Sequence, residues 1–375
     1  MKQIVLVACG DYRDLDQYLQ LKDSKKILLV CDPSISFLGI NDYFLTLEER
    51  LGVKVVRFSD FQPNPLYESV VKGVDVFLTE ACDTIVAVGG GSAMDVAKCI
   101  KLYSNMDRSE NYLKQSIVPN DIPFIAVPTT AGTGSEATRY AVIYYKGEKQ
   151  SIADYSCIPS VVLFDTSVLE TLPLYQKKAT LMDAMCHSIE SFWSVNSTDE
   201  SKGYSREAIG LIIKNYKDYL AGDDSKNELM LKASHIAGKA INITQTTAGH
   251  AMSYKLTSLF RIAHGHAAAL CIKGIWPFMV EHTGNCIDSR GEEYLKDTFA
   301  EIADAMGCSS VEEAISKFGN MVDELELPIP ENVTDKDYEV LRNSVNPVRL
   351  KNNPVALSVE DIDVIYHGVL GDKNK

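Results

Sequence analysis

Four side chains in the second half of the chain have the chemistry of a metal site. Asp183 and His187 are four residues apart, so a helix would place both on one face. His250 and His264 follow, and on one continuous helix they would lie ~21 Å apart. We therefore predict a helix break between Phe260 and His264 that brings the imidazoles together. One carboxylate and three imidazoles suit Fe²⁺ or Zn²⁺, with an open position for a substrate oxygen.

Four polar side chains are candidates for contact with a substrate or for proton transfer. His266 would point away from the ligand face of its helix, and we predict that it binds substrate and moves a proton. Tyr254 shares a face with His250, one turn away, and is the second catalytic candidate. Lys255 and Arg139 are cations that we predict bind substrate. The alternatives are structural, since a lone histidine or Tyr254 is most often packed and Lys255 would be a solvated charge.

A glycine-rich turn follows the apolar run Ile85–Val88 and continues as Gly89-Gly90-Gly91-Ser92 at the start of a helical segment. Glycines let the backbone approach a phosphate, and a helix N-terminus adds about half a positive charge. The dinucleotide pattern GxGxxG is not met, because Met94 occupies its third glycine position. The turn therefore predicts phosphate binding, with a strand–helix turn that binds nothing as the alternative.

A second loop rich in hydroxyl groups and glycines, Pro128–Glu136, follows the apolar run Phe124–Val127. Ligands bind at the carboxyl ends of strands in open parallel sheets, so two such loops predict a shared site. Asp32 follows the apolar run Ile27–Cys31 and could accept a hydrogen bond from a ribose hydroxyl. The alternative for Asp32 is an Asx-turn before Pro33.

Apolar runs and helix-length segments alternate over the first half of the chain. The runs are rich in Val and Ile and most do not alternate with polar residues, which is typical of strands buried on both faces. The predicted strands are Ile4–Ala8, Ile27–Cys31, Lys54–Phe58, Thr84–Val88, Phe124–Val127 and Val161–Phe164. Predicted crossover helices, such as Pro65–Glu80 and Ser92–Tyr103, lie between several of them. This order indicates a doubly wound parallel sheet.

Helical patterns replace the strand signals in the second half. The predicted helices are Gln176–Trp193, Ser201–Ala221, Ser225–Ile243, Ser310–Asp323 and Asp335–Ser344. We therefore predict an α/β, Rossmann-like N-terminal domain over residues 1–170, which binds a dinucleotide. An all-α C-terminal domain over residues 171–375 would hold the metal.

Composition limits the classes of function. The chain has 375 residues, of which 46% are hydrophobic and 23% charged, so it is not a disordered protein. A formal net charge of −14 argues against binding to nucleic acid or to an anionic membrane surface. It leaves open a small anionic substrate, which needs only a local cluster of cations.

The cysteines and the apolar runs favour a cytoplasmic protein. The chain has nine cysteines and no CxxC spacing, which favours a reducing compartment over a disulfide framework. The first apolar run, from Ile4 to Cys9, is too short for a signal peptide. No run of apolar residues has the length of a transmembrane helix.

Together these motifs resemble the iron-dependent (group III) alcohol dehydrogenase family over nearly the whole chain. The family's GGGS-x-x-D-x-A-K turn is present at Gly89–Lys98, and its P-T-T-x-G-T-G-S-E loop at Pro128–Glu136. Its D-x3-H and H-x13-H metal ligands match the four residues named above. The resemblance implies one divalent metal, Fe²⁺ with Zn²⁺ as the alternative, in the helical domain. It also implies an active site between the two domains and a homodimer.

The same resemblance implies which residues bind NAD(P). The match at Asp32 favours NAD(H), with NADP(H) as the open alternative. The implied cofactor contacts are Asp32, Asn64, Gly90, Gly91, Ser92, Asp95, Thr129, Thr130, Thr133, Ser135, Lys149 and Leu169.

Within the family, the segments Thr244–Ser258 and His264–Leu270 most resemble phosphonoacetaldehyde reductases. Tyr254 stands where many members have a histidine, and His266 where many have an aliphatic residue. A phosphonate needs cations and hydrogen-bond donors. The expected reaction is therefore NADH-linked reduction of phosphonoacetaldehyde to 2-hydroxyethylphosphonate.

Three alternatives to this reaction remain. The first is reduction of succinate semialdehyde to 4-hydroxybutyrate, or of a simple alkanal. The second is a lyase similar to the dehydroquinate synthases, which would consume no net NADH. The third is a binding protein that keeps the fold without catalysis.

Overall fold

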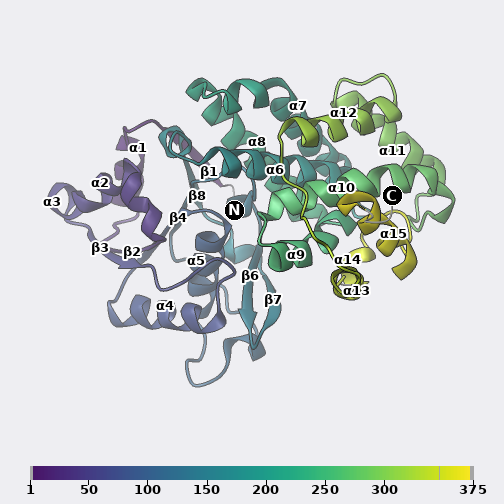
Figure 1. The fold of residues 1–375 in the computed structure, drawn as a ribbon. Coiled ribbons are helices and arrows are strands. Elements are labelled where there is room, and N and C mark those ends of the chain that lie inside the picture. The colour runs from purple at the N-terminus through teal and green to yellow at the C-terminus, as the bar shows by residue number, and fades with distance from the viewer. Residues whose placement is uncertain (1–2, 346, 372–375) are drawn as a thin grey trace. The chain divides into compact units, whose positions relative to one another are not determined.

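The computed structural model describes residues 3–345 and 347–371. Contacts divide the chain into two units. The N-terminal unit contains the chain up to Leu172 together with Gly222–Leu231, and the C-terminal unit contains Pro173–Ala221 and the chain from Lys232. The predicted parallel sheet and the predicted helical second half are both confirmed (Figure 1).

The N-terminal unit is built on six parallel strands in the order β1-β8-β5-β4-β2-β3. All six predicted strands are confirmed within one or two residues at their ends. They are β1 (Ile4–Ala8), β2 (Lys26–Cys31), β3 (Lys54–Phe58), β4 (Thr84–Gly89), β5 (Phe124–Pro128) and β8 (Val161–Asp165). An antiparallel hairpin, β6 (Tyr140–Tyr145) with β7 (Glu148–Ala153), was not predicted. It turns at Lys146-Gly147, where both residues have positive φ.

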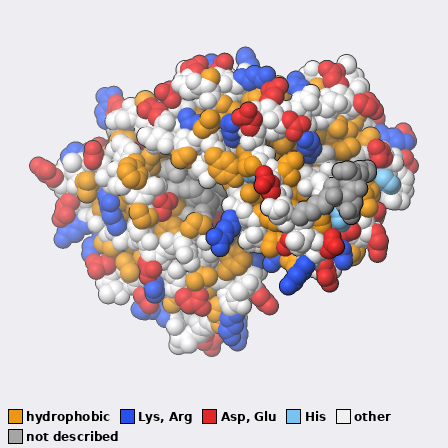
Figure 2. Space-filling model, in the orientation of Figure 1, with side chains coloured by type: hydrophobic (Ala, Val, Ile, Leu, Met, Phe, Trp, Pro, Cys, Tyr) orange, Lys and Arg blue, Asp and Glu red, His pale blue; other side chains and the backbone are white. Residues whose placement is uncertain are grey.

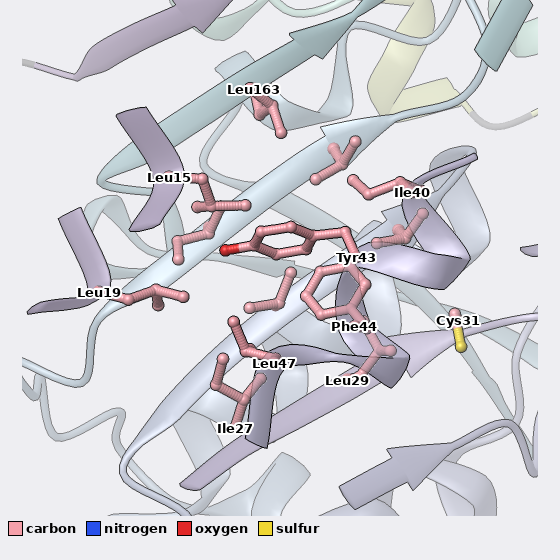
Figure 3. Packing of buried hydrophobic residues seen from close by; sticks show 14 of the residues in the cluster. Leu15, Leu19, Ile27, Leu29, Cys31, Ile40, Tyr43, Phe44, Leu47 and Leu163 are labelled. Carbon is pink, nitrogen blue, oxygen red and sulfur yellow. The ribbon is translucent and has the colours of Figure 1, made fainter. Parts of the chain in front are cut away.

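Helices cover both faces of this sheet. Alternate residues of a strand point to opposite faces. Figure 3 shows Leu15, Tyr43 and Leu47 from helices packed against Ile27 and Leu29 of β2. The helices on this face are α1 (Arg13–Leu21), α2 (Ile40–Leu45) and α3 (Leu47–Leu51). On the other face α4 (Tyr67–Thr79) packs on α5 (Gly91–Tyr103), which contacts β4 and β2.

The C-terminal unit is helical. Its helices are α6 (Leu174–Trp193), α7 (Asp199–Leu220), the larger part of α8 (Asn227–Thr244), α9 (Ala248–Phe260), α10 (His264–Glu281), α11 (Glu292–Ala305), α12 (Val311–Glu324), α13 (Asp335–Asn343), α14 (Pro347–Leu350) and α15 (Val359–Leu370). The predicted break is confirmed, because α9 ends at Phe260 and α10 begins at His264. Arg261 ends α9 in the left-handed conformation. Helices α11, α14 and α15 were not predicted.

Charges of both signs are interspersed over the face of the molecule that Figure 2 shows. No helix in the described parts of the chain is both long enough and apolar enough to cross a lipid bilayer. All nine cysteines lie within the described residues, and all are free thiols.

Candidate functional site

Three of the four predicted metal ligands meet inside the C-terminal unit. One ligand atom each from Asp183, His187 and His250 lies within 4.8 Å of the other two. All three side chains are buried, and the rings of His187 and His250 stack with centroids 4.3 Å apart. Helix α6 supplies Asp183 and His187 from one face, and the first turn of α9 supplies His250.

This cluster fits a divalent transition metal. Asp183 Oδ1 lies 3.5 Å from His250 Nε2, and neither atom has a hydrogen-bond partner among the described residues. Buried polar atoms without partners are costly, and a cation would satisfy both of them. A carboxylate oxygen and imidazole nitrogens are donors that Fe²⁺ and Zn²⁺ accept.

The charges in the cluster depend strongly on one another. Burial alone would raise the pKa of Asp183, but the nearby His187, His250 and His264 outweigh it and lower that pKa below its ordinary value. Burial alone would lower the pKa of His250, but the carboxylates of Glu190 and Asp183 raise it to about 10. The cluster therefore strongly attracts positive charge, which a proton or a metal ion can supply.

A close approach of α10 to α6 positions the residues at the start of α10 next to the cluster. Gly265, in the first turn of α10, lies against α6: a Cβ atom there would come within 2.5 Å of the Cβ of Asp183. Only glycine allows this contact without a shift of backbone. The contact places His264 beside the α6 ligands.

His264, the fourth predicted ligand, lies next to the cluster. Its ring is 5.2 Å from the ring of His250, between centroids, and it stacks on Tyr254 at 5.1 Å. Its Nδ1 lies 3.5 Å from Ser253 Oγ. A role for His264 as ligand stays a prediction.

His266 is fully buried and faces a residue that the sequence did not indicate. Its Nδ1 lies 3.1 Å from the hydroxyl of Tyr175, which also accepts a hydrogen bond from Ala263 N at 2.9 Å. Burial lowers the pKa of His266 to about 4, so its ring is neutral near neutral pH. Tyr175 thus links the start of α10 to the start of α6. The predicted roles of His266, Tyr254 and Lys255 in catalysis and substrate binding stay predictions.

Glu190 is a further buried residue at the cluster that sequence analysis missed. It lies three residues after His187 on α6 and contacts Nδ1 of His250. The spacing Asp183, His187, Glu190 on one helix face was the available signal.

The two glycine loops of the N-terminal unit lie side by side at the carboxyl ends of β4 and β5. A Cβ atom on Gly90 would lie 3.4 Å from Thr130 Oγ1, and one on Gly91 would lie 3.2 Å from Thr133 Cγ2. Thr129 N donates to the carbonyl of Gly89 at 3.1 Å. Ser92 lies in the first turn of α5, whose N-terminus faces this junction. Bare backbone next to a helix N-terminus suits a phosphate.

A buried charge network holds the second loop against α5. Lys98 Nζ donates to Ser135 O at 2.6 Å and to Tyr140 O at 2.7 Å. Ser135 Oγ in turn donates to Asp95 Oδ1 at 3.2 Å. Burial raises the pKa of Asp95 to about 6, although Lys98 and Lys149 both oppose this rise.

The other predicted contacts of the N-terminal unit have different surroundings. Asp32 Oδ1 accepts from Ser34 N at 2.8 Å, and its Oδ2 lies 3.6 Å from a Cβ placed on Gly89, so Asp32 lies at the glycine turn. Asn64 has a left-handed φ of 59°, and Leu169 is fully buried. The guanidinium of Arg139 lies 4.7 Å from the ring of Tyr155. Their contacts with cofactor or substrate stay predictions.

Comparison with known protein families covers both units. The model "Iron-containing alcohol dehydrogenase" matches residues 3–166. The model "Fe-containing alcohol dehydrogenase family, C-terminal" matches residues 177–370.

Individual relatives agree with these matches. The chain is 30% identical over 331 residues to aldehyde-alcohol dehydrogenase 2 of Entamoeba histolytica. This alignment covers 82% of this chain but only 38% of the length of that protein. It is 28% identical to the NAD-dependent methanol dehydrogenase of Bacillus methanolicus, with 97% of each chain covered.

A solved structure shares the whole fold. The sulfoacetaldehyde reductase of Bifidobacterium kashiwanohense, crystallised with NAD⁺, superposes with a TM-score of 0.87 at 25% identity over 98% of this chain and 97% of that one. Matches to both family models, over almost the whole sequence, establish that this chain belongs to the iron-containing alcohol dehydrogenase family.

Proposed function

We propose that the chain is a metal-dependent, NAD(H)-linked alcohol dehydrogenase that reduces a short aldehyde. The observation that carries this proposal is the buried cluster of Asp183, His187 and His250, which offers a carboxylate and two imidazoles at one point. His264, beside them, is the proposed fourth ligand. A divalent ion there would act as a Lewis acid toward a carbonyl or hydroxyl oxygen.

The glycine loops of the N-terminal unit are the proposed site for NAD(H), which would supply or accept the hydride. The bare backbone at Gly90 and Gly91 and the N-terminus of α5 would bind the pyrophosphate. Asp32 at the glycine turn would accept from the ribose hydroxyls, which favours NAD(H) over NADP(H). The further proposed contacts are Asn64, Ser92, Asp95, Thr129, Thr130, Thr133, Ser135, Lys149 and Leu169. Two similar proteins, the methanol dehydrogenase and the sulfoacetaldehyde reductase, are named with NAD.

The proposed substrate is phosphonoacetaldehyde, reduced to 2-hydroxyethylphosphonate. Its phosphonate group would need cations and donors, which Arg139, Lys255, Tyr254 and His266 supply in an otherwise acidic protein. The similarity to a sulfoacetaldehyde reductase supports an anionic two-carbon aldehyde, because a sulfonate replaces the phosphonate on the same carbon skeleton.

One assay separates this proposal from its alternatives. Metal-loaded protein is mixed with NADH and, in turn, with phosphonoacetaldehyde, sulfoacetaldehyde, succinate semialdehyde and butanal, and the loss of NADH absorbance is followed. The proposal expects the highest kcat/KM with phosphonoacetaldehyde. Preference for another aldehyde would overturn the substrate, and no NADH loss with any aldehyde would overturn the reaction.

We also propose that the protein is a homodimer, paired through β1. This strand is an edge of the sheet, and Ile4, Val5 and Val7 are 49%, 41% and 47% exposed. An apolar strand with a free hydrogen-bonding edge is a template for a second strand. The strand has no charged side chain, so pairing with its own copy brings no like charges together.

Light scattering on the variant Val7→Lys tests the dimer. We expect it to have the mass of one chain, and wild type that of two. Val364→Lys, which changes a valine 63% exposed on α15, is the matched control and should stay dimeric. A dimeric Val7→Lys protein would contradict the proposed interface.

A cytoplasmic location is proposed from the nine free thiols, which suit a reducing compartment.

A further inference from the structure

A second buried carboxylate lies behind the metal cluster. Glu190 of α6 is fully buried, and its Oε2 is hydrogen-bonded to Nδ1 of His250. The other ring nitrogen of His250, Nε2, faces Asp183 Oδ1 at 3.5 Å. The His250 ring therefore lies between two carboxylates, one inside the cluster and one outside it.

The other oxygen of Glu190 holds the start of α9. Oε1 accepts from the backbone N–H groups of Thr247 and His250, both at 3.1 Å, and from Thr247 Oγ1 at 2.7 Å. The first N–H groups of a helix need acceptors from outside it, and Thr247 provides no side-chain cap for α9. Glu190, which lies on α6, accepts these hydrogen bonds instead. The positive end of the α9 dipole also stabilises its negative charge.

The surroundings fix Glu190 in this position. Trp193 Nε1 donates to Thr247 Oγ1 at 3.0 Å, so the hydroxyl that donates to Glu190 is itself held. Gly249 leaves the space that the carboxylate occupies, because a Cβ atom there would lie 3.0 Å from Glu190 Oε1. Neither oxygen of Glu190 can move without loss of a buried hydrogen bond.

These contacts determine which nitrogen of His250 carries a proton. A carboxylate only accepts, so Nδ1 of His250 must donate to Glu190. A neutral imidazole with its proton on Nδ1 has its lone pair on Nε2. That lone pair is directed toward Asp183 and the centre of the cluster.

We propose that Glu190 is a positioning residue of the metal centre, which holds His250 in the tautomer and orientation that bind metal through Nε2. The inference rests on the proposed function, since it assumes a metal at Asp183, His187 and His250. Carboxylates that orient a metal-binding histidine typically change metal affinity 10–100-fold when they are replaced.

The variant Glu190→Gln separates orientation from folding. Its carbonyl oxygen can take the three hydrogen bonds of Oε1, so the cap of α9 is kept. Its amide group then donates toward Nδ1, which moves the proton of neutral His250 to Nε2 and removes the ligand lone pair. The matched control is Asp288→Asn, since Asp288 is also a buried carboxylate of this unit but pairs with Arg290.

Metal-free wild type, Glu190→Gln, Glu190→Asp and Asp288→Asn are titrated with Co²⁺, and binding is followed by d–d absorption. We expect 10–100-fold weaker binding for Glu190→Gln, an intermediate affinity for Glu190→Asp, and wild-type affinity for Asp288→Asn. In the Zn²⁺-loaded wild type, the ¹⁵N shifts of His250 should show metal bound at Nε2 and the proton on Nδ1. If Glu190→Gln does not fold, Glu190→Asp alone decides the proposal by its lower Co²⁺ affinity.

Wild-type Co²⁺ affinity in the folded Glu190 variants would overturn this inference and leave the proposed function intact. Equal weakening by Asp288→Asn would also overturn it, because the effect would then follow the loss of any buried carboxylate. A wild-type protein that binds no Co²⁺ would overturn the proposed function itself, and with it the role of Glu190.

Discussion

Gly265 lies so close to Ala179 that a Cβ atom on the glycine would be 2.1 Å from the alanine carbonyl oxygen. This close contact brings the N-terminus of α10, with His264, onto the helix that carries Asp183 and His187. Backbone atoms cannot move aside as a flexible side chain can, so a side chain at position 265 must push the helices apart.

Gly265→Ala should therefore lower both stability and metal affinity. Overpacking of this kind costs about 1–3 kcal/mol of unfolding free energy. The matched control is Gly210→Ala in α7, where a Cβ atom would meet open space and alanine should stabilise the helix by about 0.5–1 kcal/mol. Urea unfolding and Co²⁺ titration of both variants check this. Wild-type metal affinity in Gly265→Ala would contradict the role given to this contact.

Replacement of His264 by alanine should weaken metal binding and leave the fold intact. Wild type at free metal a hundredfold above Kd should gain about 2.7 kcal/mol of unfolding free energy, a gain that chelation removes. His264→Ala should lose most of this gain, because a proposed ligand is absent. His367→Ala, whose ring stacks on Tyr338 in α13, is the control and should keep the gain. Thermal unfolding with and without Fe²⁺ or Zn²⁺ measures this gain for wild type and for each variant.

Lys98→Met should weaken NADH binding. Lys98 Nζ donates to the Ser135 and Tyr140 carbonyls and to the Ser135 and Thr138 hydroxyls, and each acceptor left buried without a donor costs about 1–3 kcal/mol. Loss of these bonds frees the loop beside the glycine turn. The control is Lys101→Met on the same helix, since Lys101 Nζ donates to Asn120, which lies in another loop. Fluorescence titration with NADH should show weaker binding for Lys98→Met alone.

Asp95 should make stability fall as pH rises. Burial raises its pKa from 3.8 to about 6 in the folded chain, so the folded state binds more protons than the unfolded state between these values. The favourable contribution of Asp95 to the free energy of unfolding is complete below its pKa in the unfolded chain. This contribution is lost as the pH rises through its pKa in the folded chain. Two pKa units correspond to about 3 kcal/mol. Asp95→Asn removes the effect, so the difference in unfolding free energy between the two proteins should change by about 2 kcal/mol from pH 4 to pH 7, since pH 4 already lies above the unfolded pKa. A difference that does not vary with pH would contradict the buried-acid assignment.

The elements could be predicted wherever their pattern is local. Uninterrupted apolar runs such as Ile27–Cys31 allowed the parallel strands to be predicted, because strands buried on both faces need no polar alternation. The hairpin of β6 and β7 was not predicted. It pairs outside the main sheet, and β7 has charged and polar residues where the predicted strands have an apolar run.

The candidate metal ligands could be predicted from the sequence, but the contacts that position the histidines could not. Asp183 and His187 are one helical turn apart, so their common face follows from helix geometry alone. Glu190 shares the helix face of these ligands, but its contact with His250, 60 positions away, follows no periodicity in the sequence. The same holds for the contact of Tyr175 with His266, 91 positions away.

The amino-acid sequence by itself determined the order of the main strands and helices and the residues with metal-binding chemistry. All of these depend on neighbours within a few positions, where backbone geometry and side-chain type are sufficient. The tertiary structure alone decided that Gly265 meets the backbone of α6 and that Glu190 faces His250. Such contacts arise when separate helices pack, because the packing of whole side-chain surfaces chooses which distant residues touch.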